Sequence, residues 1–275
     1  MKKLISLLLA GFILPVSLIA FADPEQDRLA LIAHYENALP GIKLDDYVLG
    51  ALSMNEEAKE QYDDVMSFPP FATDVREGGN IWEKPFRNGQ RFGNCFKYEG
   101  INAAATYPLY DDTAGRVITF ENAINACLKL NNEAELAYGS REMSLLTSYA
   151  RSLSDNSRVR VKIKSAGALA AYEHGKKLYY ERNGQMNFAC ATCHVDNAGK
   201  MLRSEQLSMM VGQASHWPEF RAGTEPVTLQ MRFRQCQKNI RAKQFELNSQ
   251  DANDLEFFMT YMSNGLKMQT PVFRK

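Results

Sequence analysis

The sequence has almost no net charge. Its 275 residues include 32 Lys and Arg and 32 Asp and Glu, so the formal charge at pH 7 is zero. A basic excess is what draws a protein to nucleic acid or to an anionic membrane surface, so this balance gives no reason to expect either partner. The length allows an ample hydrophobic core and is compatible with two domains of ordinary size.

The sequence also has only one long apolar run, which lies at its beginning. Lys2 and Lys3 precede an apolar run from Leu4 to Ile19, and small residues stand at the −3 and −1 positions of a cut after Ala22. This pattern predicts a cleavable secretory signal peptide at residues 1–22. A membrane anchor is the alternative, but the run is shorter than the about 20 apolar residues of a spanning helix.

Cysteine is rare, with five residues in the whole sequence. The mature chain would begin at Asp23 and carry a formal charge of −2, because 30 Lys and Arg stand against 32 Asp and Glu. Export places the chain outside the membrane in an oxidising compartment, which we expect to be the periplasm. Unpaired thiols in such a compartment need a reason.

Two of the cysteines form the motif Cys190-Ala-Thr-Cys193-His194. A zinc site would need about four ligands, and no second C-x-x-C or paired His lies within the usual reach. A thioredoxin-like dithiol should follow a buried strand, whereas residues 168–180 have helical periodicity. The motif therefore favours a covalent haem c, with Cys190 and Cys193 as thioether attachment points and His194 as the proximal iron ligand.

The surrounding segments agree with a cytochrome c domain. Apolar residues recur at helical spacing before the motif and again at 254–262, which gives the order first helix, haem motif, wrapping loop and last helix. The proline-containing stretch from Phe68 to Asp112 predicts an irregular loop, and strands should be few and short. We expect a mainly α protein.

The second axial ligand of the iron has several candidates. An electron-transfer cytochrome c uses methionine there, and His216 is also possible. The methionine candidates are Met259, Met262 and Met268, with Met209, Met210 and Met231 less well placed. Cys236 is another, since a helix over 230–245 would put Arg232 one turn away, where it could stabilise a thiolate and attract a small anion. A buried structural cysteine beside a solvated arginine explains the same spacing.

Three stretches together resemble the SoxA family, the cytochrome c subunits of periplasmic SoxAX complexes in sulfur-oxidising bacteria. They are the Cys190–His194 motif, the run Ala198-Gly-Lys-Met-Leu-Arg203, and Met231-Arg-Phe-Arg-Gln-Cys236. C-x-x-C-H is common to all c-type cytochromes, so the Arg-x-x-x-Cys motif makes the match specific. The resemblance implies that His194 and Cys236 are the axial ligands. It also implies that Cys236, which can carry a persulfide in this family, is catalytic together with Arg232.

The resemblance also implies an activity and partners. The family acts as an L-cysteine S-thiosulfotransferase, joining thiosulfate oxidatively to a cysteine of the carrier protein SoxYZ. The electrons leave through haem and the partner cytochrome SoxX. Two rivals stay open: a plain electron-transfer cytochrome with His/Met ligation, and a scaffold subunit with a vestigial haem.

Many members of the family have two haems in two cytochrome c-like halves. The first half here has no C-x-x-C-H, so the resemblance implies one haem c, a haem-less domain at 23–155 and a haem domain at 156–275. A polar run at 154–157 predicts the linker between them. As relics of duplication, Tyr149 matches Tyr261, and Cys127 stands where a distal ligand would be. With that haem lost, we expect a Cys95–Cys127 disulfide.

Overall fold

The computed structural model describes residues 23–221 and 225–274, so the predicted signal peptide at 1–22 lies outside the described residues. Helices dominate it. They are α1 (Pro24–Ala38), α2 (Glu56–Ser67), α3 (Ala72–Glu83), α4 (Phe120–Leu130), α5 (Arg141–Ser152), α6 (Ala166–Tyr180), α7 (Cys190–His194), α8 (Leu229–Asn239) and α9 (Gln250–Met262). Within the described ranges, no helix is long and apolar enough to cross a membrane.

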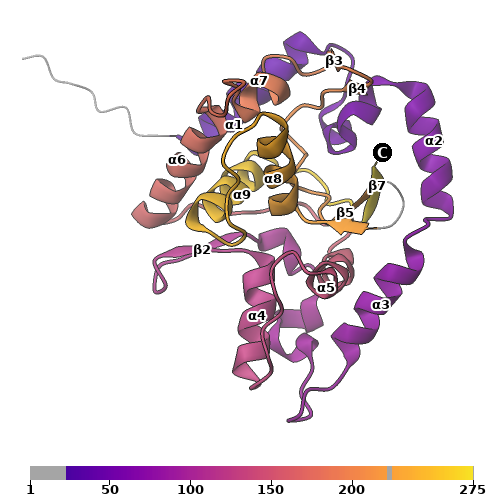
Figure 1. Cartoon of the computed structure of the whole chain (residues 1–275), viewed down its shortest axis with the longest axis vertical. Coiled ribbons are helices and arrows are strands. Elements are labelled where there is room, and N and C mark those ends of the chain that lie inside the picture. The colour runs from indigo at the N-terminus through magenta and orange to yellow at the C-terminus, as the bar shows by residue number, and fades with distance from the viewer. Residues whose placement is uncertain (1–22, 222–224, 275) are drawn as a thin grey trace, which may run out of the picture.

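The strands are short, as expected. They are β1 (Leu109–Asp111), β2 (Arg116–Ile118), β3 (Met201–Leu202), β4 (Glu205–Gln206), β5 (Glu219–Arg221), β6 (Glu225–Val227) and β7 (Val272–Arg274). β1–β2 and β3–β4 are antiparallel pairs, and β5 lies between antiparallel β6 and parallel β7. In Figure 1, α8 and α9 lie in the upper part of the molecule and α4 and α5 in the lower part.

In the first half, α3 crosses α5 at very short range. A Cβ added to Gly78 would lie 2.1 Å from the carbonyl oxygen of Leu145, so the absence of a side chain lets the two backbones touch. One helical turn later, Trp82 packs against Tyr149, with ring centroids 6.4 Å apart. The crossing depends on glycine at position 78.

The second half repeats this crossing with α6 and α9. A Cβ on Gly175 would lie 2.0 Å from the carbonyl oxygen of Asp254. One turn later, Tyr179 packs against Phe258 at 5.6 Å between ring centroids. The pair α6 and α9 is therefore the terminal helix pair that the sequence predicts for a cytochrome c domain.

The helices α4 and α8 show the same correspondence between the halves. Thr119 caps α4 by accepting a hydrogen bond from a backbone N–H, and Thr228 caps α8 in the same way. Eight residues after each cap stands a cysteine, Cys127 in α4 and Cys236 in α8. Cys127 and Cys236 therefore hold equivalent positions in the two helices, and the expectation that this is the position of a distal ligand stays a prediction.

The sequence-based match of Tyr149 with Tyr261 is three residues out of register. Ser140 caps α5 and Ser249 caps α9, and Tyr149 lies nine residues after its cap. The residue nine positions after Ser249 is Phe258. The sequence match is wrong because a tyrosine stands at both 149 and 261. The packing requires only an aromatic ring one turn after the glycine crossing, and phenylalanine at 258 provides it.

The predicted loop over 68–112 is wrong in part, because α3 occupies Ala72–Glu83. Pro69 and Pro70 lie before this helix and Pro85 lies after it, as is usual for prolines that flank a helix. Adjacent glycines inside it lower its intrinsic helix propensity, so the sequence signal is weak. Packing against α5 stabilises the helix despite them. The expected helix over 230–245 is shorter, since α8 ends at Asn239.

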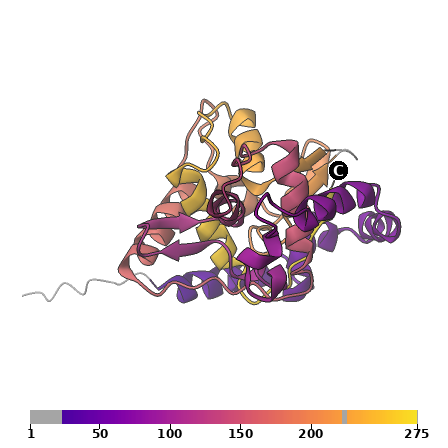
Figure 2. The same ribbon diagram turned by 90° about the horizontal axis from the view of Figure 1, so that it is seen from below.

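The halves share one hydrophobic core rather than two separate ones. The hairpin β1–β2 of the first half lies against α6 and α9 of the second (Figure 2). The predicted linker is also packed: Ser154 is fully buried, and the backbone N–H of Asn156 donates to the carbonyl oxygen of Met268. Helix α1 joins the second half, because Asp27 accepts hydrogen bonds from Tyr172 and from the α6 residue Lys176. The domain boundary at 155 remains a prediction.

Candidate functional site

The haem motif forms the single helical turn α7. Thr192 fixes its start, because the Thr192 hydroxyl accepts a hydrogen bond from the backbone N–H of Ala189 at 3.0 Å. Cys190 and Cys193 both have free thiols. Burial raises the pKa of the Cys190 thiol to about 12, and the nearby Cys236 adds to the rise. Among the described residues, no group of three or more His, Cys, Asp or Glu could hold a metal ion.

His194 is held in the orientation that an iron ligand needs. Its Nδ1 lies 2.9 Å from the carbonyl oxygen of Ser208. Because a carbonyl oxygen can only accept, Nδ1 carries the hydrogen and donates a hydrogen bond to it. The other ring nitrogen, Nε2, then keeps a free lone pair for a metal. Burial lowers the pKa of His194, and the positive charge of Arg232 lowers it further, which favours the neutral imidazole.

Tyr35 on α1 holds the backbone of His194 in place by a hydrogen bond. Its hydroxyl donates to the backbone carbonyl of His194 at 2.6 Å and accepts from the backbone N–H of Met210 at 3.0 Å. Tyr35 is fully buried, and burial raises its pKa, so it remains a neutral donor. The motif is thus fixed to the loop that follows it and to a helix 150 or more residues earlier in the chain.

An unpaired polar atom lies beside the attachment cysteines. The hydroxyl of Tyr179 is buried and has no hydrogen-bond partner among the described residues. Burial raises the pKa of Tyr179, and Cys190 and Cys193 are close enough to add to the rise. A free Nε2, two unbonded thiols and an unpaired buried hydroxyl together fit a covalent haem c, in which the thiols form the thioethers.

Helix α8 brings Cys236 to this motif. Gly184 permits it, because a Cβ there would lie 2.4 Å from the carbonyl oxygen of Ile240 at the end of α8, and the backbone N–H of Met186 donates to the same oxygen at 3.3 Å. The thiol of Cys236 is free and partly buried. Electrostatic interaction with Cys236 adds to the rise in the pKa of Cys193 as well as that of Cys190, so Cys236 lies near both attachment cysteines.

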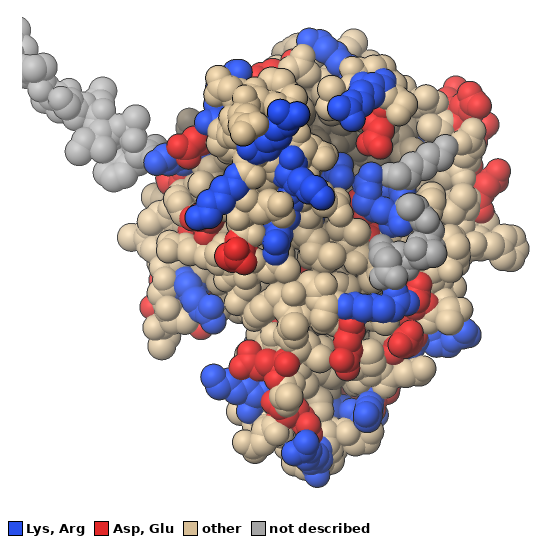
Figure 3. Space-filling view, viewed as in Figure 1, with Lys and Arg blue, Asp and Glu red and all other residues tan. Residues whose placement is uncertain are grey.

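Arg232 lies one turn before Cys236 on α8, as the i, i+4 spacing predicts. Its side chain donates to Gln235 at 3.3 Å, and its charge acts on His194. Figure 3 shows Lys and Arg side chains gathered on the face where α8 lies. On α8 and the turn after it these residues are Arg232, Arg234, Lys238, Arg241 and Lys243.

Two of the alternative axial ligands, His216 and Met262, lie against other side chains. Nε2 of His216 lies 3.3 Å from Glu219, and both side chains are buried. The sulfur of Met262 lies 3.6 Å from the hydroxyl oxygen of Tyr172 within the α6–α9 interface. Met259 and Met268 are buried in the core.

The disulfide Cys95–Cys127 is present, with 5.8 Å between the two Cα atoms. It joins α4 to the segment where the attachment site of a first haem would lie. Asn131 at the end of α4 donates to the backbone carbonyl of Cys127 at 2.8 Å, which fixes the helix end beside the bridge.

Comparison with known proteins gives the family. A family model described as "SoxA/TsdA, cytochrome c domain" matches residues 77–159 and 174–268. An "L-cysteine S-thiosulfotransferase subunit SoxA" of Allochromatium vinosum is 36% identical over 275 residues, which cover 99% of this chain and 98% of the relative. The chain belongs to the SoxA family.

Other relatives of this SoxA-family chain agree. A protein of the same name from Chlorobaculum tepidum is 37% identical over 252 residues, which cover 91% of this chain and 88% of the relative. Among solved structures, "Crystal structure of SoxXA from P. pantotrophus" matches with a TM-score of 0.72 and 30% identity, over 78% of this chain and 84% of that one. The fold is therefore mainly α and cytochrome c-like, as expected, and the family implies haem c.

Sequence reasoning missed three residues of the site: Tyr35, Tyr179 and Ser208. Tyr179 belongs to residues 168–180, for which the sequence indicates only helical periodicity, and nothing in the sequence links Tyr35 or Ser208 to His194. The roles of Cys190, Cys193, His194, Arg232 and Cys236 come from the motif and the family resemblance, and they remain predictions.

Proposed function

We propose that this chain is the SoxA-type subunit of a periplasmic L-cysteine S-thiosulfotransferase. It would join thiosulfate to a cysteine of a SoxYZ-like carrier protein, in a complex with a SoxX-like cytochrome. The observation that carries the proposal is electrostatic proximity: Cys236 on α8 is close enough to Cys190 and Cys193 to raise their pKa values, and Arg232 is close enough to lower the pKa of His194. The printed name of the relatives gives the same activity.

A single haem c would be held by thioethers to Cys190 and Cys193, with His194 as proximal and Cys236 as distal ligand. When bound, the haem accepts electrons one at a time. The chain's own residues prepare its place: Ser208 sets the tautomer of His194, and Tyr35 holds the His194 backbone. Thr228 caps the start of α8, the helix that carries Cys236.

Arg232 would bind the substrate. Thiosulfate is a small dianion, and a guanidinium can hold two of its oxygens at once. The basic residues on and after α8 raise the local concentration of anions before binding. The sulfane sulfur would then lie next to Cys236, where the new bond is made.

The reaction is an oxidation that the chain alone cannot complete. Thiosulfate and the carrier thiol form one S–S bond, and the thiol loses its proton while two electrons leave the pair of sulfurs. Since one haem takes one electron, a second redox centre is needed, and a SoxX-like partner with its own haem would supply it. The solved structure with a similar chain is titled SoxXA, which supports this partner.

The test is a thiosulfate-dependent conjugation assay with SoxX-like and SoxYZ-like partners supplied. Cys236→Ala should lower turnover at least 100-fold, because the sulfur beside the motif is lost. Arg232→Gln should raise KM for thiosulfate about tenfold or more, as the loss of a charge-assisted hydrogen bond worth 1.5 kcal/mol or more predicts. Lys129→Gln is the matched control, because it removes an exposed charge from α4, the counterpart of α8 in the first half, and should leave KM within about twofold.

A visible spectrum of the same variants separates the proposal from a plain electron-transfer cytochrome. Methionine ligation gives a weak band near the red edge of the visible, and thiolate ligation does not. If Cys236→Ala leaves both the spectrum and the conjugation rate unchanged, the proposal is wrong and the electron carrier remains.

A further inference from the structure

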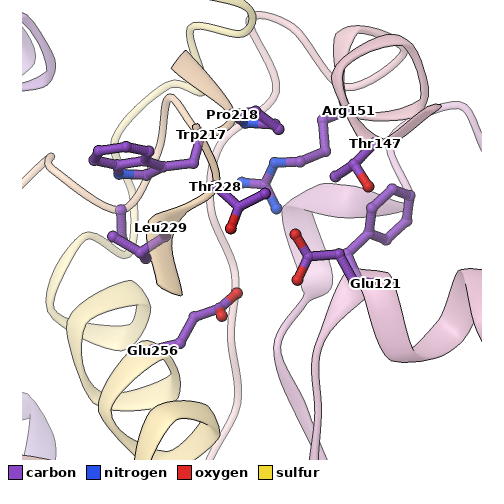
Figure 4. Close-up of a pocket in the computed structure, with 10 residues that line it drawn as sticks. Glu121, Thr147, Arg151, Trp217, Pro218, Thr228, Leu229 and Glu256 are labelled. Carbon is purple, nitrogen blue, oxygen red and sulfur yellow. The ribbon is translucent and has the colours of Figure 1, made fainter. Parts of the chain in front are cut away.

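A small cavity lies where the two halves meet, away from the haem motif. It is lined by the start of α4, by α5, by α9, by the start of α8 and by the segment before β5. The space open to the centre of a water molecule is about 20 Å³. Figure 4 shows the side chains of Glu121, Arg151 and Glu256 turned toward one another from three helices.

Two buried polar atoms in this wall have no partner among the described residues. They are Nε of Arg151 and the hydroxyl oxygen of Thr147, both on α5. Arg151 is 7% exposed and Thr147 is 2% exposed, so bulk water does not satisfy them. A cavity needs about 10–15 Å³ and two to four polar partners to hold an ordered water molecule, and this one offers both.

The charges around the cavity do not balance. Glu121 comes from the first half and Glu256 from the second, and the cavity has one cation, Arg151. The remaining lining residues, from α8, α4, α5 and the segment before β5, carry no charge. A buried carboxylate, Glu256, and a partly buried one, Glu121, beside one guanidinium repel each other unless one of them keeps its proton.

We propose that this cavity binds one ordered water molecule, held by Thr147 and Arg151, and that Glu121 carries a proton at neutral pH. The water and the proton together join the two halves. Glu256 is the ionised partner: burial raises its pKa as well, but the hydrogen bond that it accepts from Gln230 at 2.9 Å offsets part of that rise. Burial raises the pKa of Glu121 to about 8, and the charge of Glu256 adds to the rise.

The internal repeat supports the neutral form of Glu121. Glu121 lies two residues after the cap Thr119, and the residue two positions after the corresponding cap Thr228 is Gln230. A protonated glutamic acid and a glutamine have nearly the same shape, and both can donate a hydrogen bond. The water molecule and the protonated Glu121 therefore also position α8, because its first turn lines the cavity and its second turn carries Cys236.

The proton is tested by the pH dependence of stability in the purified haem-loaded protein. If Glu121 keeps its proton in the folded state and loses it on unfolding, the free energy of unfolding falls as pH rises from about 4.5 to about 8. Within this range, each pH unit multiplies the equilibrium constant of unfolding by about ten. Glu121→Gln should remove this slope relative to wild type. Glu142→Gln, an exposed glutamate on α5, should keep it. An unchanged slope in Glu121→Gln overturns the proposal.

Two further measurements do not depend on how that variant folds. The infrared spectrum of wild type at pH 7 should contain the carbonyl band of a protonated carboxylic acid, which Glu121→Gln lacks and Glu142→Gln retains. A high-resolution crystal structure should show one water molecule within hydrogen-bond distance of Thr147 and Arg151. Thr147→Ser should keep this water and Thr147→Val should lose it. A dry cavity or a metal ion in wild type overturns the proposal.

Discussion

Gly175→Ala tests whether the contact between α6 and α9 depends on the missing side chain. The new Cβ would lie 2.0 Å from the carbonyl oxygen of Asp254 and 2.8 Å from the Cβ of Phe258. An ordinary contact is 3.4 Å or more. Because the first obstacle is backbone, no side-chain rotation relieves it, and the helices must separate by more than about 1 Å to restore a normal carbon–oxygen distance.

The expected cost follows from two opposing effects. Overpacking a core costs about 1–3 kcal/mol, and a clash with rigid backbone belongs at the upper end of that range. Alanine gains about 1 kcal/mol over glycine in helix propensity. We expect the free energy of unfolding to fall by about 2 kcal/mol net, and the Tm by about 4–8 °C at this chain length.

Thermal and urea unfolding of the haem-loaded protein measure the effect. Gly167→Ala is the matched control on the same helix, because its new Cβ would meet the hydroxyl end of Tyr110, a flexible side chain that can turn away. Gly78→Ala should reproduce the loss in the first half. Equal or higher stability of Gly175→Ala, with Gly167→Ala unchanged, would refute the close crossing.

Two other substitutions test the disulfide and the hydrogen bond between Tyr35 and His194. Replacing Cys95 and Cys127 together by serine should lower the free energy of unfolding by about 3–4 kcal/mol, from the loop entropy of a bridge that spans 32 residues; denaturant unfolding with and without reductant checks this, and a reductant effect that persists in the double variant would contradict it. Tyr35→Phe removes one buried donor to the backbone of His194 and should cost about 1–3 kcal/mol, with a shifted haem spectrum. Tyr98→Phe, 81% exposed, is the control and should change neither the stability nor the spectrum.

The part of the site that is local in the sequence could be predicted from it. The five-residue motif Cys190–His194 indicates haem c because attachment and ligation need residues at fixed adjacent positions. The i, i+4 pair Arg232 and Cys236 shares one helix face for the same reason, since helical geometry alone sets it. Family resemblance added the disulfide between Cys95 and Cys127, which the structure contains.

Predictions failed where tertiary contacts outweigh local preference. Helix α3 forms around Gly78 although glycine disfavours helices, because α5 needs the close approach that glycine gives. The register of the repeat was misjudged at Tyr149, since a tyrosine recurs nearby at Tyr261 by composition alone. Packing, rather than residue identity, shows that Phe258 is the true counterpart.

The sequence by itself determined the low cysteine content and predicted the signal peptide and the haem c site, because each of these predictions depends on neighbouring residues. Only the tertiary structure decided which distant groups meet. Tyr35 lies 159 positions from His194, and Glu121 lies far from Glu256 along the chain. No local pattern records such contacts, because they arise only when helices from both ends of the chain pack into one core.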